Sequence, residues 1–387
     1  MQRGTFQLMK SVNKSIVLNT IRIKEQISRA QIAKDTSLTP PTVSSIVREL
    51  MEEGLVVESI LGNSSGGRKP TLLHINRELY VIGVDAGPET IDCAVTDVTG
   101  KIITRISNVL SENISKEDFL ALLVSSIQSV VNDKYINTSK IIGIGVAMHG
   151  VVDVDTGTSL IAPNLHLHDI PIKSRLEEVF PYMVKVENDA RAMALGEAWF
   201  GEHSDTDSML AINFGNGVGA GIVIKGELLH GAQDIAGEVG HMTIDLKGDI
   251  CSCGNRGCFQ SYASGPAIAS RFSNKFQTKE ALTAADIYEQ AIDGEKQAME
   301  HLENTGEIMG IAIVNIIHTL NPERIVLGGG VMKSKQFILP SLIQTVEKRV
   351  LTERAKNTQI VVSELGDDAT MYGAASLVLV ELFDQQA

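Results

Sequence analysis

Apolar residues recur at helical spacing in two stretches near the start of the chain. Between Asn13 and Lys24 they fall on one face of a helix. From Pro40 onward they follow the i, i+3, i+4, i+7, i+8 pattern, and Gly54 ends that helix. The residues of this second apolar face are Val43, Ile46, Val47, Leu50 and Met51. We therefore expect two amphipathic helices that share one core.

A short helix lies between these two. Ser28 and Gln31 have the spacing of a capping box. In this motif each side chain accepts a hydrogen bond from the backbone amide of the other residue. We expect this helix to end near residues 36–37. Thr39 is then the cap of the longer helix, with Pro40 in its first turn. Helix, short helix, turn and longer helix is the order of a helix-turn-helix.

Small hydrogen-bonding residues and one cation occupy the outward face of the longer helix. They are Pro41, Thr42, Ser44, Ser45 and Arg48. Residues 55–60 and 71–75 have the composition of two strands, joined by a flexible tip with Arg68 and Lys69, as in a wing. We predict that the helix enters a major groove and that the wing cations contact a minor groove or phosphates. The alternative is that these helices only pack together.

Charge is unevenly divided along the 387 residues, a length that favours two or three domains. The net charge of −13 by itself argues against nucleic acid. Residues 1–77, here called the head, nevertheless hold 11 Lys and Arg against 6 Asp and Glu, so the head carries +5 and the remainder −18. A basic head on an acidic body is typical of a DNA-reading module attached to another domain.

The body, residues 78–387, alternates strands with helices, which indicates an α/β architecture. An apolar strand that runs into a Gly-containing turn occurs at 80–87 and again at 209–219, with helices following at 117–131 and 261–271. This predicts an internal duplication. Together with the glycines at 328–330, such turns favour an ancestral nucleotide cleft, although glycine also serves turn geometry alone.

Asn188 and Asp189 lie where a predicted strand, 182–186, meets a predicted helix, 190–200. Polar side chains at the carboxyl end of a strand commonly face a ligand cleft. Asn and Asp are also preferred helix caps, and base rates favour that role. Both interpretations stay open at this point.

Three of the four cysteines cluster in residues 237–260. Cys251, Cys253 and Cys258, with His241 upstream, supply the three thiolates and one imidazole of a tetrahedral structural zinc site. Cys93 stands alone in an apolar segment, and we expect it to be buried.

The sequence predicts a cytoplasmic protein with no membrane partner. No apolar run reaches the ~18 residues of a membrane span, and the N-terminus lacks the apolar core of a signal peptide. Thiols stay reduced in the cytoplasm, so clustered cysteines favour a metal over disulfides.

Seven motifs resemble those of the ROK family (repressors, open reading frames and sugar kinases). They are VIGVDAG at 81–87, APN at 162–164, VENDA at 186–190, GNGVGAGIV at 215–223, GEVGHMTID at 237–245, CSCGNRGC at 251–258 and NPERIVLGGG at 321–330. The pair GE-x-GH and CxCGxxGC is close to diagnostic. With the winged head and its SSGGRKP tip, the chain is most similar to the xylose repressors of this family.

The resemblance implies a winged helix-turn-helix followed by a two-lobed, actin-like sugar-kinase fold (ribonuclease H-like, duplicated), with the sugar between the lobes. The DNA-binding domain would span 1–77 and the sugar-binding domain 78–387. The small lobe would take about 78–190 plus the C-terminal helix, and the large lobe about 191–370.

The resemblance also implies roles for single residues. The sugar ligands would be Asn164, Asn188, Asp189, Glu238, His241 and Gln260, the last standing where the family usually has Glu. The structural zinc ligands would be His241, Cys251, Cys253 and Cys258. In family kinases Asp189 would be the general base, and His241 would serve metal and sugar with its two ring nitrogens.

Three departures from the kinase pattern bear on function. Pro88 and Glu89 replace the Gly-Thr of the first phosphate turn, which removes an amide donor and adds a negative charge. Asn216 replaces the usual Thr of the second turn, and His149 stands where kinases have Pro before Gly150. From the two altered turns we expect ATP binding to be lost and the chain not to be an enzyme, whereas His149 bears on which sugar is bound.

The leading hypothesis is a sugar-responsive transcriptional repressor. A homodimer or dimer of dimers would bind palindromic operator DNA and be released by a monosaccharide inducer, xylose or a related sugar. The alternative is an ATP-dependent sugar kinase of ROK type with an appended DNA-binding head. A third possibility is control by a protein regulator.

Overall fold

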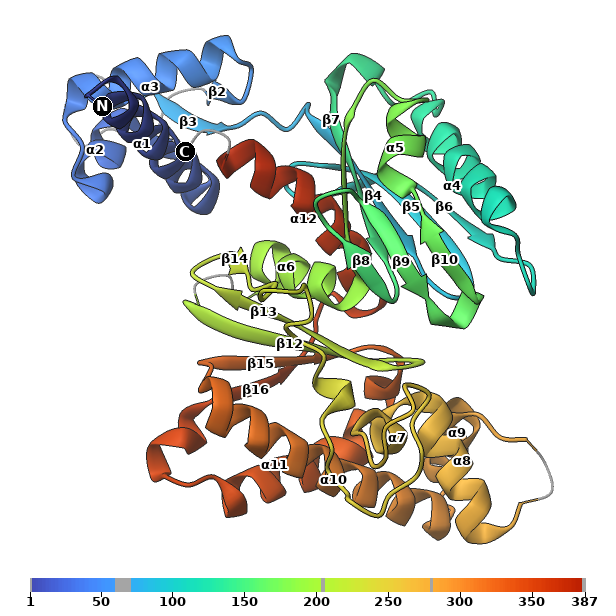
Figure 1. Cartoon of the computed structure of the whole chain (residues 1–387). Helices are drawn as coiled ribbons and strands as arrows, with labels where there is room; N and C mark the ends of the chain where they lie inside the picture. Colours follow the sequence, from blue (N-terminus) through green and yellow to red (C-terminus); the bar gives the residue numbers. More distant parts are fainter. Residues whose placement is uncertain (1, 60–70, 203–205, 279–280, 385–387) are drawn as a thin grey trace.

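The structure is a computed structural model that describes residues 2–59, 71–202, 206–278 and 281–384 (Figure 1). A helical head is followed by two lobes, each built on a five-stranded sheet. The C-terminal helix returns to lie between the two lobes, with its end against the head. None of the helices in these described ranges combines the length and hydropathy needed to cross a membrane.

The head contains three helices and a small antiparallel sheet in the order β1-β3-β2. Its elements are α1 (Gln2–Lys24), β1 (Ile27–Ser28), α2 (Arg29–Thr36), α3 (Pro40–Glu52), β2 (Val56–Ser59) and β3 (Leu72–Ile75). The predicted helix-turn-helix and its two wing strands are confirmed. The first helix begins at Gln2 rather than at Asn13, and one strand, β1, was not predicted.

The caps of α2 and α3 follow the sequence, with one correction. Ser28 Oγ accepts a hydrogen bond from the Gln31 amide nitrogen at 3.2 Å, and Thr39 Oγ1 accepts one from the Thr42 amide nitrogen at 3.4 Å. The Gln31 side chain donates to Asp35 at 2.5 Å instead of reaching back. The prediction that Gln31 bonds back to the Ser28 backbone is therefore wrong, because the carboxylate of Asp35, one turn later, accepts from the Gln31 side chain.

The first lobe is built on a sheet in the order β11-β7-β4-β5-β6. β4, β7 and β11 are parallel, and β5 and β6 continue antiparallel. Its strands are β4 (Tyr80–Ala86), β5 (Thr90–Asp97), β6 (Ile102–Val109), β7 (Ile141–Met148) and β11 (Met183–Asn188). A side sheet and two helices complete it: β8 (Val151–Asp153), β9 (Thr158–Ala162), β10 (Leu167–Ile170), α4 (Lys116–Val131) and α5 (Ile172–Glu177). Cys93 on β5 is buried, as predicted, and burial raises the pKa of its thiol.

The second lobe repeats the same pattern, with the sheet order β14-β13-β12-β15-β16. β12, β15 and β16 are parallel, and β13 and β14 continue antiparallel. Its strands are β12 (Ser208–Phe214), β13 (Val218–Ile224), β14 (Glu227–Leu228), β15 (Arg324–Gly328) and β16 (Gln359–Val362). Its helices are α7 (Gln260–Ala263), α8 (Gly265–Phe276), α9 (Ala284–Ile292), α10 (Lys296–Leu320) and α11 (Lys335–Arg349). The strand-for-strand repeat confirms the predicted duplication.

The helix predicted at 261–271 is divided into α7 and α8. Ser264 adopts extended backbone angles (φ −76°, ψ 156°), and its Oγ accepts a hydrogen bond from the Ala267 amide nitrogen at 3.3 Å. Pro266 occupies the first turn of α8. Ser264 and Pro266 are thus a start signal inside an apolar pattern that continues across it.

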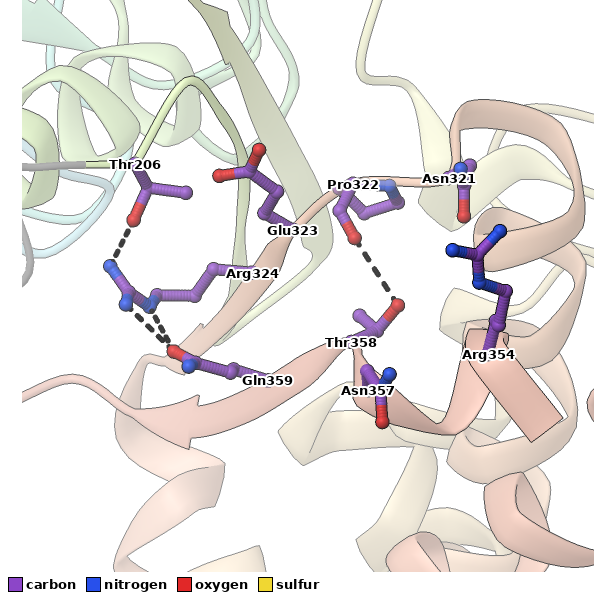
Figure 2. Close-up of a pocket in the computed structure, with 9 residues that line it drawn as sticks. All are labelled: Thr206, Asn321, Pro322, Glu323, Arg324, Arg354, Asn357, Thr358 and Gln359. Atoms are coloured by element: carbon purple, nitrogen blue, oxygen red, sulfur yellow. Dashed lines mark hydrogen bonds between the residues drawn. The ribbon is translucent and has the colours of Figure 1, made fainter.

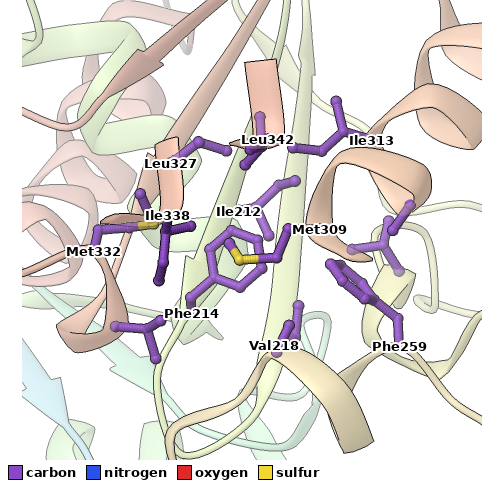
Figure 3. Close-up of a cluster of buried hydrophobic side chains, with 14 of the residues drawn as sticks. Ile212, Phe214, Val218, Phe259, Met309, Ile313, Leu327, Met332, Ile338 and Leu342 are labelled. Carbon is purple, nitrogen blue, oxygen red and sulfur yellow. The ribbon is translucent and has the colours of Figure 1, made fainter. Parts of the chain in front are cut away.

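The core of the second lobe reaches the cysteine-rich segment (Figure 3). Phe214 on β12 and Phe259 meet edge to face with ring centroids 5.9 Å apart, and both side chains are fully buried. Phe259 lies between Cys258 and Gln260 in the sequence. The aromatic pair therefore anchors the end of this segment to the lobe.

Two helices, α6 (Asp189–Phe200) and α12 (Ala369–Asp384), pack along each other in the middle of the molecule. A Cβ atom at Gly373 would lie 1.8 Å from the Ala192 carbonyl oxygen, so only glycine permits this approach. The head is joined to the ends of both helices. Trp199 meets Phe383 edge to face at 5.3 Å, and the Arg22 guanidinium lies 4.1 Å from the centre of the Trp199 ring.

We expect Gly373→Ala to destabilise the body, because the added methyl group forces α6 and α12 apart. The cost should be about 1–3 kcal/mol, as for overpacked cores. The measurement is the midpoint of urea unfolding. Gly330→Ala is the matched control, since a Cβ there meets no atom within 4 Å; equal midpoints for the two variants would show that the helix contact is not tight.

Candidate functional site

The outward face of α3 presents the residues predicted to meet DNA. Pro41, Ser44, Ser45 and Arg48 are exposed. Thr42 is half-buried, and its hydroxyl forms a 2.8 Å hydrogen bond with that of Thr39. Arg68 and Lys69 lie outside the described residues.

Asn188 is both a helix cap and part of the candidate ligand site. Its Oδ1 accepts a hydrogen bond from the Arg191 amide nitrogen at 3.0 Å, which caps α6. Its Nδ2 donates to the Gly150 carbonyl and to Asp189 Oδ1, both at 2.9 Å. The amide thus fixes Asp189 at the first position of the helix, and the Ala190 amide nitrogen donates to the same oxygen at 2.8 Å.

An ion network around the buried side chains of Glu187 and Arg191 stands behind these residues and was not predicted. Glu187 Oε1 accepts from Arg191 Nε, and its Oε2 contacts His230 Nε2, both at 2.7 Å. Arg191 also donates to the Asp234 carbonyl at 2.6 Å. The hydrogen bond to Glu187 raises the pKa of His230. The network connects the segment 230–234 to the start of α6. No local sequence signal indicates that these distant residues pair.

Glu238 and His241 are held by a tight turn that rests on β13. Gly237 has φ +96°, and a Cβ there would lie 2.0 Å from the Ala220 carbonyl oxygen. A Cβ at Gly240 would lie equally close to the Val218 carbonyl oxygen. The two glycines therefore let the backbone lie directly on the strand, and Glu238 between them is exposed.

Electrostatics shows which acidic groups lie together. Burial raises the pKa of Asp189, the charge of Glu238 raises it further, and charge on His149 opposes the rise. Burial, with Asp189 and Asp92 next, raises the pKa of Asp85 to about 8. Asp189 is thus near groups from β4, from the β7–β8 turn and from the Glu238 turn.

The other two predicted sugar ligands are placed differently. Asn164 is exposed in a short 3-10 turn, η2 (Pro163–Leu165), whose proline lies over Gly150. Gln260 Nε2 donates to Cys251 Sγ at 3.1 Å and to Ser252 Oγ at 3.2 Å. The Gln260 amide group therefore faces the cysteine cluster in this structure.

The four predicted metal ligands come together. The ligand atoms of His241, Cys251, Cys253 and Cys258 all lie within 4.8 Å of one another. Cys253 Sγ is 3.8 Å from Cys258 Sγ, and Cys251 Sγ is 3.9 Å from His241 Nδ1. A tetrahedron with ~2.3 Å zinc–sulfur bonds has edges of roughly 3.8 Å, so the spacing suits such an ion. The other ring nitrogen, Nε2, is 3.7 Å from Glu238 Oε2.

Thiol chemistry also favours a cation in this cluster. Burial by itself would raise the pKa of Cys251, but hydrogen bonds from Cys253 and Gln260 lower it to about 6. Burial and the neighbouring cysteines raise the pKa of Cys258 to about 12. Ionising all three thiols this close together is costly, and a bound cation offsets that cost.

The two turns in which the sequence departs from the kinase pattern contact each other across the lobes. Asn216 Nδ2, in the β12–β13 turn, donates to Glu89 Oε1, in the β4–β5 turn, at 3.3 Å. Arg105 on β6 binds Asp368 at 2.6 Å, just before α12. Side chains thus link the β4–β5 turn to the β12–β13 turn, and β6 to the segment before α12.

A separate pocket lies at the amino ends of β15 and β16 (Figure 2). Its volume is about 400 Å³, and Arg324 in its wall binds Gln359 at 2.7 Å and also contacts Thr206. It is lined by Thr206, Asn321, Pro322, Glu323, Arg324, Arg354, Asn357, Thr358 and Gln359. None of these was predicted to bind sugar, and ligands of such sheets bind at the opposite, carboxyl ends.

Comparison with known proteins identifies relatives of both parts. A family model described as ROK family matches residues 81–381, and a winged helix-turn-helix DNA-binding model matches residues 16–57. The xylose repressor of Bacillus subtilis (strain 168) is 34% identical over 378 residues, which are 97% of each chain. The glucokinase of Halalkalibacterium halodurans is 34% identical over 316 residues, 77% of this chain and 94% of its own.

Solved structures agree with this division. The crystal structure of a ROK family transcriptional regulator, a homologue of the E. coli MLC protein, aligns with 98% of both chains at 29% identity and a TM-score of 0.85. The alignment includes the head as well as both lobes. The chain therefore belongs to the ROK family and carries a winged helix-turn-helix domain ahead of the sugar-kinase fold.

Proposed function

We propose that the protein is a transcriptional repressor that binds operator DNA and releases it when a monosaccharide binds between its lobes. The observation that carries this proposal is the winged head joined to the ROK body, an arrangement shared over the full length with a xylose repressor. The kinase relative covers only 77% of this chain, against 97% for the repressor. We propose xylose or a related sugar as the inducer.

Asn164, Asn188, Asp189, Glu238, His241 and Gln260 are the proposed sugar ligands. Support comes from the α6 start and the Glu238 turn, whose charges interact. Hydroxyl groups of a sugar are donors, and the carboxylates of Asp189 and Glu238 are strong acceptors for them. Gln260 would reach the sugar only by giving up its hydrogen bond to Cys251, so of these residues its support as a sugar ligand is the weakest.

The contact between Glu89 and Asn216 supports a loss of ATP binding. A carboxylate at this turn repels a phosphate, and Pro88 offers no amide donor. Asp189 then serves as a sugar ligand rather than as a general base. The rival proposal, a sugar kinase with an added head, requires ATP turnover; rates of roughly 1–100 s⁻¹ with any sugar would favour it over the repressor.

We propose that the cluster of His241 and the three cysteines holds a structural zinc ion. The tetrahedral spacing of its donors and the hydrogen bond from Gln260 to Cys251 both fit that role. The ion would fix the loop and orient His241, with Nδ1 toward the metal and Nε2 toward Glu238. Metal loss would then weaken sugar binding as well as stability.

The proposed signal passes through α6. The helix begins at Asp189 and ends at Trp199 and Phe200, against Arg22 and Phe383. A shift at its start on sugar binding therefore changes the packing under the head. In a dimer on a palindromic operator, a change in head spacing disfavours the DNA-bound form.

Asp189→Asn should abolish release of DNA by sugar while operator binding persists. The loss of a charged hydrogen bond should weaken sugar binding roughly tenfold to a hundredfold. Titration calorimetry with D-xylose, D-glucose and N-acetyl-D-glucosamine measures this, and fluorescence anisotropy follows an operator selected from random duplexes by the wild-type protein. Asp155→Asn, which changes an exposed carboxylate of the same lobe, is the control. Unchanged release of DNA by sugar in Asp189→Asn would show that Asp189 does not bind the sugar.

Arg48→Ala should weaken operator binding by ~1–3 kcal/mol if the side chain contacts a base edge, since its guanidinium is exposed on the face of α3. Anisotropy at fixed salt on the selected operator gives the affinity. Lys296→Ala removes an equally exposed cation from the body and is the control. Equal affinities of the two variants would exclude Arg48 from the DNA face.

Cys253→Ser should release the metal, because one thiolate of four ligands is lost. Metal analysis after dialysis should fall from one zinc per chain toward none, and the midpoint of thermal unfolding should fall with it. Cys93→Ala, which alters a buried cysteine of the other lobe, should keep the metal. One zinc per chain in Cys253→Ser would refute the assigned ligand set.

A further inference from the structure

His149 is a buried residue with an unusual hydrogen-bonding state. It follows β7 in the turn to β8, and it is 5% exposed. Its Nδ1 lies 3.2 Å from the Ala86 carbonyl oxygen. Its Nε2 is buried and has no hydrogen-bond partner among the described residues. A buried polar atom without a partner is uncommon and needs an explanation.

The partner of Nδ1 determines what Nε2 requires. A carbonyl oxygen only accepts hydrogen bonds, so Nδ1 carries the proton of the neutral ring and Nε2 is a bare acceptor. In the protonated ring Nε2 becomes a donor instead. A hydroxyl group both donates and accepts, so it satisfies Nε2 in either state.

The position of His149 points to the candidate sugar site. Met148, just before it, pairs with Ala86 on one side and with Asn188 on the other, at the carboxyl ends of three parallel strands. Ligands of α/β sheets bind outside such ends. Gly150, just after it, accepts the hydrogen bond from Asn188 Nδ2. His149 therefore lies in the chain between two residues that contact Asn188, the neighbour of Asp189.

We infer that His149 is a further sugar ligand, whose Nε2 binds a hydroxyl group beside the one held by Asp189. This inference rests on the proposed function, because it names a contact within the same sugar site. It also narrows the ligand chemistry. The neighbouring acidic groups Asp189 and Glu238 disfavour an anionic group, so the pair of ligands selects a free sugar over its phosphate ester.

The competing explanation is structural. The bond from Nδ1 to Ala86 joins β4 to the turn after β7, and this could be the only task of the ring. Two substitutions separate these roles. In His149→Asn the amide nitrogen takes the place of Nδ1 and nothing replaces Nε2. In His149→Gln the amide reaches the position of Nε2 and the bond to Ala86 is given up.

Titration calorimetry of the full chain with D-xylose, D-glucose and N-acetyl-D-glucosamine tests the inference. For the sugar that the wild-type protein binds, His149→Asn should lose about tenfold or more in affinity, and His149→Gln should retain most of it. Thermal unfolding and binding to the selected operator should stay at wild-type values in the Asn variant. Wild-type affinity in His149→Asn, or a loss confined to His149→Gln, would overturn the ligand role.

A second measurement, by NMR on the wild-type protein, does not depend on whether His149→Asn folds. In wild-type protein labelled with ¹⁵N-histidine, sugar should shift the Nε2 resonance that is missing from His149→Gln. An unmoved resonance in a protein that binds sugar overturns the inference and leaves the proposed function intact. If no sugar binds the wild-type protein, the proposed sugar response fails, and the role of His149 fails with it.

Discussion

The close contact between α6 and α12 is the constraint on which the rest of the molecule depends. It requires a glycine at position 373, because the helices approach until a carbonyl of α6 fills the space of a side chain. α12 also packs on β4 and β7 of the first sheet, whereas α6 packs on β12 and β13 of the second. The pair therefore joins the lobes, and a movement of either lobe reaches the other through it.

The same pair connects the candidate sugar site to the DNA-binding head. α6 has 12 residues and is therefore about 18 Å long. Asp189 is at one end, and Trp199 lies near the other, between Arg22 of the head and Phe383 of α12. Ser15 of the head also donates to the Phe383 carbonyl at 2.7 Å. The hydrophobic core of the head continues into the end of α12. A shift of that helix therefore changes the packing of the head.

Much of the fold could be predicted because its signals are local. Ser28, Thr39 and the apolar face of α3 act within one or two helical turns, and the cysteine spacing fixes its own cluster. The division of the helix at Ser264 was missed because the apolar pattern runs across the break. The network of Glu187, Arg191 and His230 joins residues up to 43 positions apart, and only the folded chain shows that pairing.

In the candidate site, too, the sequence identifies residues but not their hydrogen-bond partners. Family motifs locate Asn188, Asp189, Glu238 and His241 without showing what each side chain bonds. Gln260 was expected at the sugar because a carboxylate is usual there, yet its amide donates to Cys251. Residue type explains this difference, since a neutral amide can donate to a thiolate where a carboxylate would be repelled.

The departures from the kinase motifs make physical sense as one set of changes. In a kinase the lobes close on two ligands, a nucleotide and a sugar. Here Glu89 and Asn216, in the two turns that depart from the kinase pattern, bond to each other, and Arg105 binds Asp368. If ATP binding is lost, as proposed, sugar is the ligand that biases the lobes. A ligand shifts such an equilibrium only by its difference in affinity for the two forms. In the proposed mechanism, a sugar held by both Glu238 and Asp189, whose charges interact, would favour one arrangement of the lobes and so change the packing at the head.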